Sequence, residues 1–170
     1  MPTELTLQEA SLADIPLIRT LAHRIWNHCY PGIISQEQID FMLGWMYAED
    51  RLEREIASGE VTFFLLQFAE NTAGFAAMGS GEAPDEQHLH KLYLLPECHG
   101  RGLGSRALTL LQERARSQGA RRLSLRVNRH NHPAIRCYER NGFRIERQIL
   151  AGIGGGYVMD DHWMVATLGP

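Results

Sequence analysis

Hydrophobic and polar positions in the first third of the chain follow a strand pattern and then a helical one. Residues 5–9 alternate apolar and polar side chains, which predicts a short strand. Ser11–Asp14 then begins a helix with apolar residues every three to four positions. Ser35 and Gln38 have the spacing of a capping box, which predicts the start of a second helical region, interrupted or continuous. Gly59 closes that region.

The middle of the chain is rich in strand-forming residues. Residues 61–68 combine β-branched and aromatic side chains and predict a buried strand. Residues 70–73 predict a turn and 74–78 the second strand of a hairpin. After a loop, residues 88–95 predict a strand that ends at Pro96.

Beyond this strand, helices and strands alternate. The apolar spacing predicts a helix that begins at Leu103 and stops near Gly119. A strand at 123–127 and a short helix at 134–140 follow. The last two predicted strands, which flank a glycine-rich turn, are 143–150 and 162–168.

This order of elements predicts an α/β fold of the α+β, mixed-sheet kind. We expect a central, largely antiparallel sheet of six to seven strands with helices on both faces. No internal repeat, low-complexity tract or linker divides the chain, so a single domain over residues 1–170 is predicted.

Composition narrows the class of protein. Of the 170 residues, 44% are hydrophobic and 22% charged, which is ordinary for a globular protein. No signal peptide and no apolar run of about 18 residues is visible, so no membrane association is expected. The three cysteines lack metal-ligand spacing and are expected to be reduced thiols of a cytoplasmic protein.

The net charge of -3 hides an uneven distribution. Residues 99–147 contain twelve Arg and three Glu, whereas the rest of the chain has five basic and seventeen acidic residues. A chain that is not basic overall does not favour nucleic-acid binding. A basic half beside an acidic half suits a site where a polyanion meets a cationic partner, although solvated helix surfaces can also divide charge in this way.

The segment from Leu92 to Arg106 is the most informative motif. A predicted strand runs into a glycine-rich loop that opens a helix, and Gly100, Gly102 and Gly104 let backbone N–H groups point inward. Together with the helix N-terminus they predict a cradle for a phosphate or pyrophosphate. No Gly-Lys-Ser/Thr follows, which excludes a P-loop, and Ser105 replaces the third glycine of a dinucleotide fingerprint.

This segment resembles the pyrophosphate-binding motif of GNAT superfamily N-acetyltransferases, Gln/Arg-x-x-Gly-x-Gly/Ala. Here the motif is His99-Gly100-Arg101-Gly102-Leu103-Gly104, and His99 departs from the usual first residue. A second signature, residues 123–143, follows at the spacing of that superfamily. Residues 26–43 and 155–161 show a softer resemblance to bacterial small-amine and polyamine acetyltransferases.

The resemblance implies an acetyl-CoA-dependent N-acetyltransferase with the GNAT acyl-CoA N-acyltransferase fold. The acetyl group would pass to a primary amine of a small, cationic acceptor by direct attack in a ternary complex. A backbone N–H near Leu94 or Leu95 would polarise the thioester carbonyl. The residues implied in binding acetyl-CoA are Leu94, Leu95, His99, Gly100, Arg101, Gly102, Leu103, Gly104, Ser105, Asn131, Ala134 and Tyr138.

The same resemblance makes Tyr138 the donor that protonates the leaving thiolate. Core packing of this tyrosine is the alternative, and Asn131 has either a pantetheine-binding or a helix-capping role. For the base we consider His88 and His90, which alternate onto one face of a strand, and Glu82 from the loop before it. An exposed polar role competes for each. The two His-x-His pairs supply no third ligand, so no metal is predicted.

Two other functions stay open from the sequence. One is a protein or peptide N-acetyltransferase, and the other is a regulatory module that binds acyl-CoA without turnover. The sequence decides neither the acceptor amine nor the oligomeric state, for which a homodimer is one option.

Overall fold

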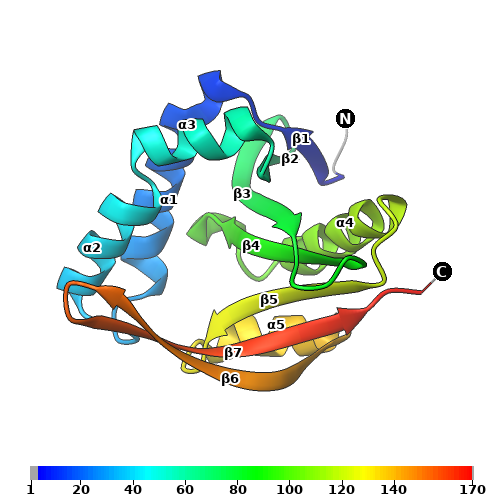
Figure 1. The fold of residues 1–170 in the computed structure, drawn as a ribbon. Helices are drawn as coiled ribbons and strands as arrows, with labels where there is room; N and C mark the ends of the chain where they lie inside the picture. Colours follow the sequence, from blue (N-terminus) through cyan, green and yellow to red (C-terminus); the bar gives the residue numbers. More distant parts are fainter. Residues whose placement is uncertain (1–3, 170) are drawn as a thin grey trace. The chain divides into compact units, whose positions relative to one another are not determined.

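The computed structural model describes residues 4–169, which contain five α-helices and seven strands (Figure 1). None of these helices is long and apolar enough to cross a bilayer. The elements are β1 (Thr6–Glu9), α1 (Ile15–Cys29), α2 (Gln36–Met46), α3 (Glu49–Ser58), β2 (Val61–Phe68), β3 (Asn71–Ser80), β4 (Glu86–Leu94), α4 (Leu103–Ser117), β5 (Arg122–Asn128), α5 (His132–Arg140), β6 (Phe143–Gly154) and β7 (Tyr157–Thr167).

The strands form one mixed sheet in the order β1-β2-β3-β4-β5-β7-β6. Strands β4 and β5 run parallel, whereas the β1–β2, β5–β7 and β6–β7 pairs are antiparallel. The predicted fold class, a mixed and largely antiparallel sheet of six to seven strands, is confirmed. The parallel ladder between β4 and β5 runs from Glu86–Arg122 to Leu89–Leu125.

The chain divides into two compact units. The first comprises the residues up to Met78 together with Lys91–Leu103, and the second comprises Gly79–His90 together with the residues from Gly104 onward. The chain passes from one unit to the other inside β4, between His90 and Lys91. The single domain expected for residues 1–170 stays a prediction.

Apolar side chains on one stripe of α1 form much of the core of the first unit. Ile18, Ala22, Ile25 and Trp26 recur every three to four residues and are buried. Helix α1 packs against α2 and α3, and α3 packs against β2. The helical region after Ser35 is interrupted between α2 and α3, and Gly59 ends α3 in the left-handed conformation at φ +73°.

The second unit places opposite kinds of side chain on the two faces of β5. Leu123, Leu125 and Val127 are buried and apolar, whereas the residues between them, Ser124 and Arg126, are polar. Helix α5 packs against β6. The face of β5 that contains Ser124 and Arg126 is therefore the one with side chains able to form hydrogen bonds and ion pairs.

Two turns lie elsewhere than predicted. The β2–β3 turn is formed by Ala69 and Glu70, which adopt positive φ values of 50° and 68°, and residues 71–73 already belong to β3. The predicted turn at 70–73 is therefore wrong by about two residues. At the C-terminal hairpin, β6 continues to Gly154 and β7 begins at Tyr157, so the turn is shorter than the predicted one between residues 150 and 162. The ladder accommodates Gly152 and Gly154 through a register shift between them.

Candidate active site

The glycine loop joins β4 to α4 through two left-handed residues. After the short 3-10 turn Pro96–Cys98, Gly100 and Gly102 adopt φ values of +71° and +75°. A Cβ built on either would meet no atom within 4 Å, so the backbone there faces open space. Gly104 lies in the first turn of α4, where N–H groups are not used by the helix itself. The loop therefore combines left-handed glycines with a helix N-terminus, and the phosphate cradle stays a prediction.

Backbone contacts fix the strand that enters this loop. The N–H of Leu95 donates to the carbonyl of Ala73 at 2.8 Å, so it already has a partner. A Cβ on Gly74 would clash with the carbonyl oxygen of Tyr93, which explains why this close approach uses glycine. The ring Nε2 of His99 lies 2.9 Å from the carbonyl oxygen of Leu94, to which it donates. His99 thus braces the loop against the strand, a role that sequence reasoning missed.

Side chains of the first unit also hold the loop. The guanidinium of Arg101 lies 5.1 Å from the centre of the Phe68 ring. Glu97, in the 3-10 turn, accepts two hydrogen bonds from Arg24 of α1, at 2.8 and 2.9 Å. A hydrogen bond from its own backbone and this guanidinium lower the pKa of Glu97. The loop is therefore tied to α1 as well as to β4.

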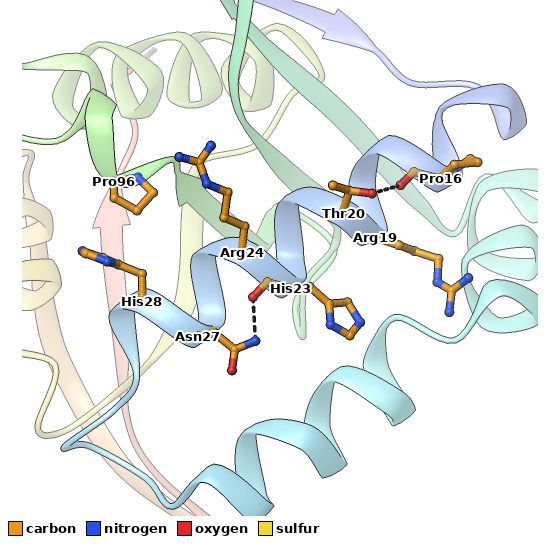
Figure 2. A pocket seen from close by; sticks show the side chains of 8 residues that line it. All are labelled: Pro16, Arg19, Thr20, His23, Arg24, Asn27, His28 and Pro96. Carbon is orange, nitrogen blue, oxygen red and sulfur yellow. Dashed lines mark hydrogen bonds between the residues drawn. The ribbon is translucent and has the colours of Figure 1, made fainter.

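A groove in the first unit lies along α1 and is lined by none of the predicted site residues (Figure 2). It has a volume of about 960 Å³. Its side chains are mostly basic or neutral, and one of them, Arg24, is engaged by Glu97. The lining residues are Pro16, Arg19, Thr20, His23, Arg24, Asn27, His28 and Pro96.

In the second unit, Asn131 and Tyr138 lie at opposite ends of α5. Asn131 is the N-cap, and its Oδ1 accepts the N–H of Ala134 at 3.4 Å. The capping alternative for Asn131 is thus present in the structure. Tyr138 is half-buried and lies edge-to-face on Phe143, with ring centres 5.7 Å apart. Asn141, which ends the helix, donates to Ser105 Oγ of α4 at 3.0 Å.

The three predicted bases have different surroundings. His88 is buried, His90 is exposed, and their rings lie 4.7 Å apart, as expected for neighbours on one face of β4. Glu82 is exposed and its carboxylate accepts from Arg147 at 2.7 Å. The guanidinium of Arg147 also lies 4.5 Å from the centre of the Trp163 ring. Glu82 is therefore held in an ion pair, whereas His90 faces solvent.

His88 is anchored on two sides. Its ring stacks on Trp163 with centres 4.9 Å apart, and its Nδ1 lies 2.8 Å from Ser124 Oγ. Burial lowers the pKa of His88 to about 4, with Arg126 acting in the same direction and Glu82 in the opposite one. The imidazole is therefore neutral over the physiological pH range.

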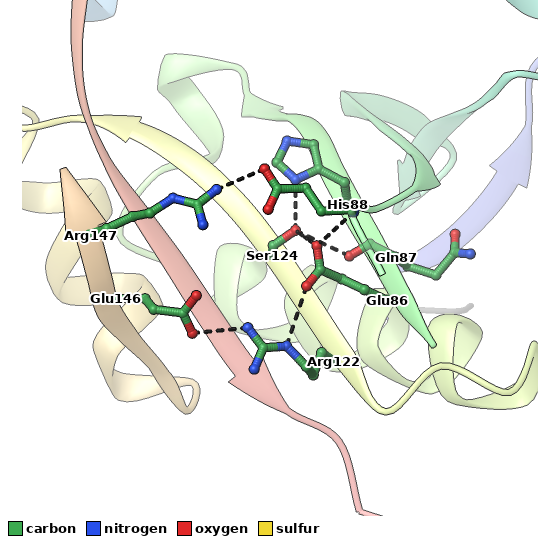
Figure 3. Close-up of polar contacts among 8 residues, drawn as sticks. Glu86, Gln87, His88, Arg122, Ser124, Glu146 and Arg147 are labelled. Atoms are coloured by element: carbon green, nitrogen blue, oxygen red, sulfur yellow. Dashed lines mark hydrogen bonds and ion pairs between the residues drawn. The ribbon is translucent and has the colours of Figure 1, made fainter. Parts of the chain in front are cut away.

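The polar residues behind His88 were not predicted from the sequence. Ser124 Oγ lies 3.1 Å from Glu86 Oε2, and Glu86 in turn accepts from the Nε of Arg122 at 3.3 Å and from the backbone N–H of Glu82 at 3.0 Å (Figure 3). Ser124 is fully buried and Glu86 is 5% exposed. A serine and a glutamate inside apolar strand patterns were the only signal available beforehand.

A strand that leaves its parallel neighbour and runs through left-handed glycines into a helix is the arrangement of acyl-CoA-dependent N-acyltransferases. The chain belongs to the acetyltransferase (GNAT) family, whose model matches residues 21–143. It is thus an N-acetyltransferase, as the sequence motifs predicted. Among residues 4–169, no three His, Cys, Asp or Glu side chains cluster in a way that could hold a metal ion.

Relatives and solved structures agree with this family. The spermidine N(1)-acetyltransferase of Thermoplasma acidophilum is 27% identical over 144 residues, which are 82% of this chain and 88% of that protein. The crystal structure of the PaiA N-acetyltransferase from T. acidophilum in complex with coenzyme A has a TM-score of 0.81 at 23% identity, covering 96% of this chain and 99% of that one. A spermidine N-acetyltransferase from Vibrio cholerae, in complex with CoA and spermine, has a TM-score of 0.74 at 19% identity over 98% and 97% of the two chains. At these identities the two structures show the shared fold.

Proposed function

We propose that this enzyme transfers the acetyl group of acetyl-CoA to a primary amine of a small, cationic acceptor, by direct attack of the amine. The observation that supports this most is the continuous run from β4 through the left-handed glycines into α4. The likeness to a spermidine acetyltransferase supports the class of acceptor.

The residues around the loop fit a pyrophosphate. A Cβ on Gly100 or Gly102 would meet no atom within 4 Å, so no neighbouring group obstructs an anion that approaches this loop before α4. The part of β4 that leads into the loop would hydrogen-bond the extended portion of acetyl-CoA through its backbone, as an added strand does. Acetyl-CoA supplies the thioester. The residues that would hold it are Leu94, Leu95, His99, Gly100, Arg101, Gly102, Leu103, Gly104, Ser105, Asn131, Ala134 and Tyr138.

Two proton transfers accompany the reaction. As the C–N bond forms and the C–S bond breaks, the amine nitrogen must lose a proton and the leaving sulfur gains one. We assign the first proton to Nε2 of His88, with exposed His90 next to it passing the proton on to water. Tyr138 donates its hydroxyl proton to the sulfur. Glu82 ranks after the histidines because Arg147 already engages its carboxylate.

The acceptor is tested by measuring thiol release from acetyl-CoA over a panel of spermidine, simple monoamines, amino acids, aminoglycosides and peptides. We expect turnover with spermidine and other polyamines, because a second ammonium group can pair with a carboxylate. Binding of acetyl-CoA without turnover of any amine would instead identify a regulatory module. Turnover confined to peptides would identify a peptide N-acetyltransferase.

A further inference from the structure

The contacts of Ser124 determine which nitrogen of His88 carries a proton. Glu86 is a carboxylate in its ion pair with Arg122 and can only accept hydrogen bonds. Ser124 has one hydroxyl hydrogen, which can go to Glu86 Oε2 at 3.1 Å, to the carbonyl of Gln87 at 3.4 Å or to an unprotonated Nδ1 of His88 at 2.8 Å. The charged carboxylate of Glu86 is the strongest acceptor of the three, so we assign the hydrogen to it. With that hydrogen used, Ser124 Oγ is left to accept from His88 Nδ1 at 2.8 Å. In a neutral imidazole, Nε2 then has the free lone pair.

We infer that Ser124 and Glu86 are positioning residues, which hold His88 in the tautomer protonated at Nδ1 so that Nε2 can accept the proton of the acceptor amine. This inference rests on the proposed function, in which His88 is the base. The inferred positioning role explains why two polar residues, Glu86 of β4 and Ser124 of β5, are buried. Apolar residues of similar size would fill these positions without the cost of burying polar groups.

The chain of contacts also stabilises the charged form of the base. When Nε2 takes a proton from the amine, the imidazolium keeps its Nδ1–H on Ser124, and the Ser124 hydroxyl remains directed at the Glu86 carboxylate. The buried carboxylate two hydrogen bonds away opposes part of the effect of burial, which lowers the pKa of His88 to about 4. No covalent bond to Ser124 or Glu86 forms or breaks.

The other groups around His88 cannot replace this chain. Trp163 fixes the plane of the ring by stacking but contacts neither nitrogen as an acceptor. Arg126, whose charge opposes protonation of His88, is itself paired with Asp161 at 3.2 Å. Arg147 engages Glu82. Of these groups, the Ser124 oxygen is the one at hydrogen-bond distance from a ring nitrogen of His88.

The first test needs no turnover. In protein labelled with 15N at histidine, the nitrogen shifts of His88 distinguish a protonated Nδ1 from a protonated Nε2. We expect Nδ1–H in the unmodified enzyme, and a mixture or the opposite tautomer in Ser124→Ala. An Nε2–H tautomer in the unmodified enzyme would overturn the inference, and so would a tautomer that Ser124→Ala leaves unchanged.

The second test is kinetic and uses a matched control. Ser124→Ala and Glu86→Gln should each lower kcat by about tenfold or more, with unchanged KM for acetyl-CoA, because the base is no longer oriented. Glu146→Gln makes the same carboxylate-to-amide change on the other partner of Arg122, at 2.9 Å, but leaves the His88 chain intact. Its kcat should stay within about twofold of the unmodified enzyme, since it removes a single partly exposed ion pair.

The failures of the two proposals are distinguishable. If the unmodified enzyme acetylates no amine, the proposed function fails, whereas the tautomer is still measured. If His88→Gln retains full turnover, His88 is not the base and the positioning role falls with it. If His88→Gln is inactive while Ser124→Ala and Glu86→Gln match Glu146→Gln in both tests, the positioning inference alone is wrong.

Discussion

Tyr138 and Lys91 show how much a single side chain depends on its surroundings. Tyr138 is half-buried on a surface helix, next to the aromatic ring of Phe143. Lys91, the only lysine of the chain, is 5% exposed in the core of the first unit. The Tyr138 ring is partly accessible to solvent, whereas Lys91 is buried where a charge is costly.

Replacing Tyr138 by phenylalanine should lower kcat by roughly 10²-fold, the range expected for the loss of a general acid. Affinity for acetyl-CoA should change little, because only the hydroxyl is removed. Steady-state kinetics with titration of CoA checks both. Tyr47→Phe is the matched control, since it removes the same hydroxyl from a buried residue outside the site and should leave kcat within about twofold. Full activity of the Tyr138 variant would assign protonation of the thiolate to water.

Lys91 should make stability depend on pH. Burial lowers its pKa from 10.5 to about 8, partly opposed by Glu55. The unfolded chain therefore binds more protons than the folded one between about pH 8 and 10.5, so this destabilisation is complete below pH 8 and disappears as the pH rises to 10.5. Lys91→Met should stabilise the protein at pH 7 by on the order of 3 kcal/mol, and much less at pH 10.

Chemical denaturation at pH 7 and pH 10 measures this difference. Arg54→Met serves as the control, because Arg54 is a cation with 73% of its side chain exposed. Its effect on the free energy of unfolding should stay within about 0.5 kcal/mol at both pH values. A Lys91→Met gain that is equal at pH 7 and pH 10 would show that packing, and not charge, causes it.

At the scale of elements, the β4–loop–α4 run combines two local requirements. The loop needs left-handed residues at 100 and 102, and the helix needs a free first turn at Gly104. Gly59 has the same conformation as Gly102, with φ +73° against +75°, and a Cβ on either meets nothing within 4 Å. The two glycines therefore differ in location and not in backbone strain.

Gly102→Ala should raise the dissociation constant of CoA by about tenfold or more, because its Cβ would enter the space intended for the pyrophosphate. Both Gly59→Ala and Gly102→Ala should lower the free energy of unfolding by roughly 1–2 kcal/mol, the cost of a left-handed non-glycine residue. Gly59→Ala should leave CoA affinity unchanged. Calorimetric titration and thermal unfolding of both variants separate strain from binding. Equal CoA affinities in the two variants would contradict the assignment of the loop.

At the scale of the whole molecule, the charges are divided between cations near the cofactor motifs and carboxylates elsewhere. In the second unit the carboxylates of Glu82, Glu86 and Asp161 are paired with arginines. In the first unit Glu37 and Glu53 are exposed on α2 and α3. We expect exposed carboxylates such as these to attract a cationic acceptor.

Spermidine should be acetylated with a higher kcat/KM than butylamine, which has a single ammonium group, and glutamate should be the poorest of the three. The preference for spermidine should shrink between about 0.01 and 1 M salt, as the screening length falls from roughly 30 to 3 Å. Rates measured for the three acceptors at both ionic strengths check this. Equal rates that are indifferent to salt would exclude an electrostatic choice of acceptor.

The sequence by itself determined the elements and the class of cofactor, because both depend on local rules. Hydrophobic spacing locates α1, α4 and β2 to within a few residues. Left-handed backbone favours glycine whatever surrounds it, and Gly100 and Gly102 both adopt that conformation. The turn of the first hairpin is formed by Ala69 and Glu70, which do not usually adopt positive φ, and the turn predicted at 70–73 was therefore wrong by about two residues.

The tertiary structure decided which polar groups meet. His88 and Ser124 are 36 residues apart in the chain, and Ser124 and Glu86 are 38 apart, so no local pattern relates them. Their pairing follows from the parallel register of β4 and β5, which places His88 opposite Ser124. Register is set by the packing of the whole sheet, and for that reason the partners of the predicted base became visible only in the fold.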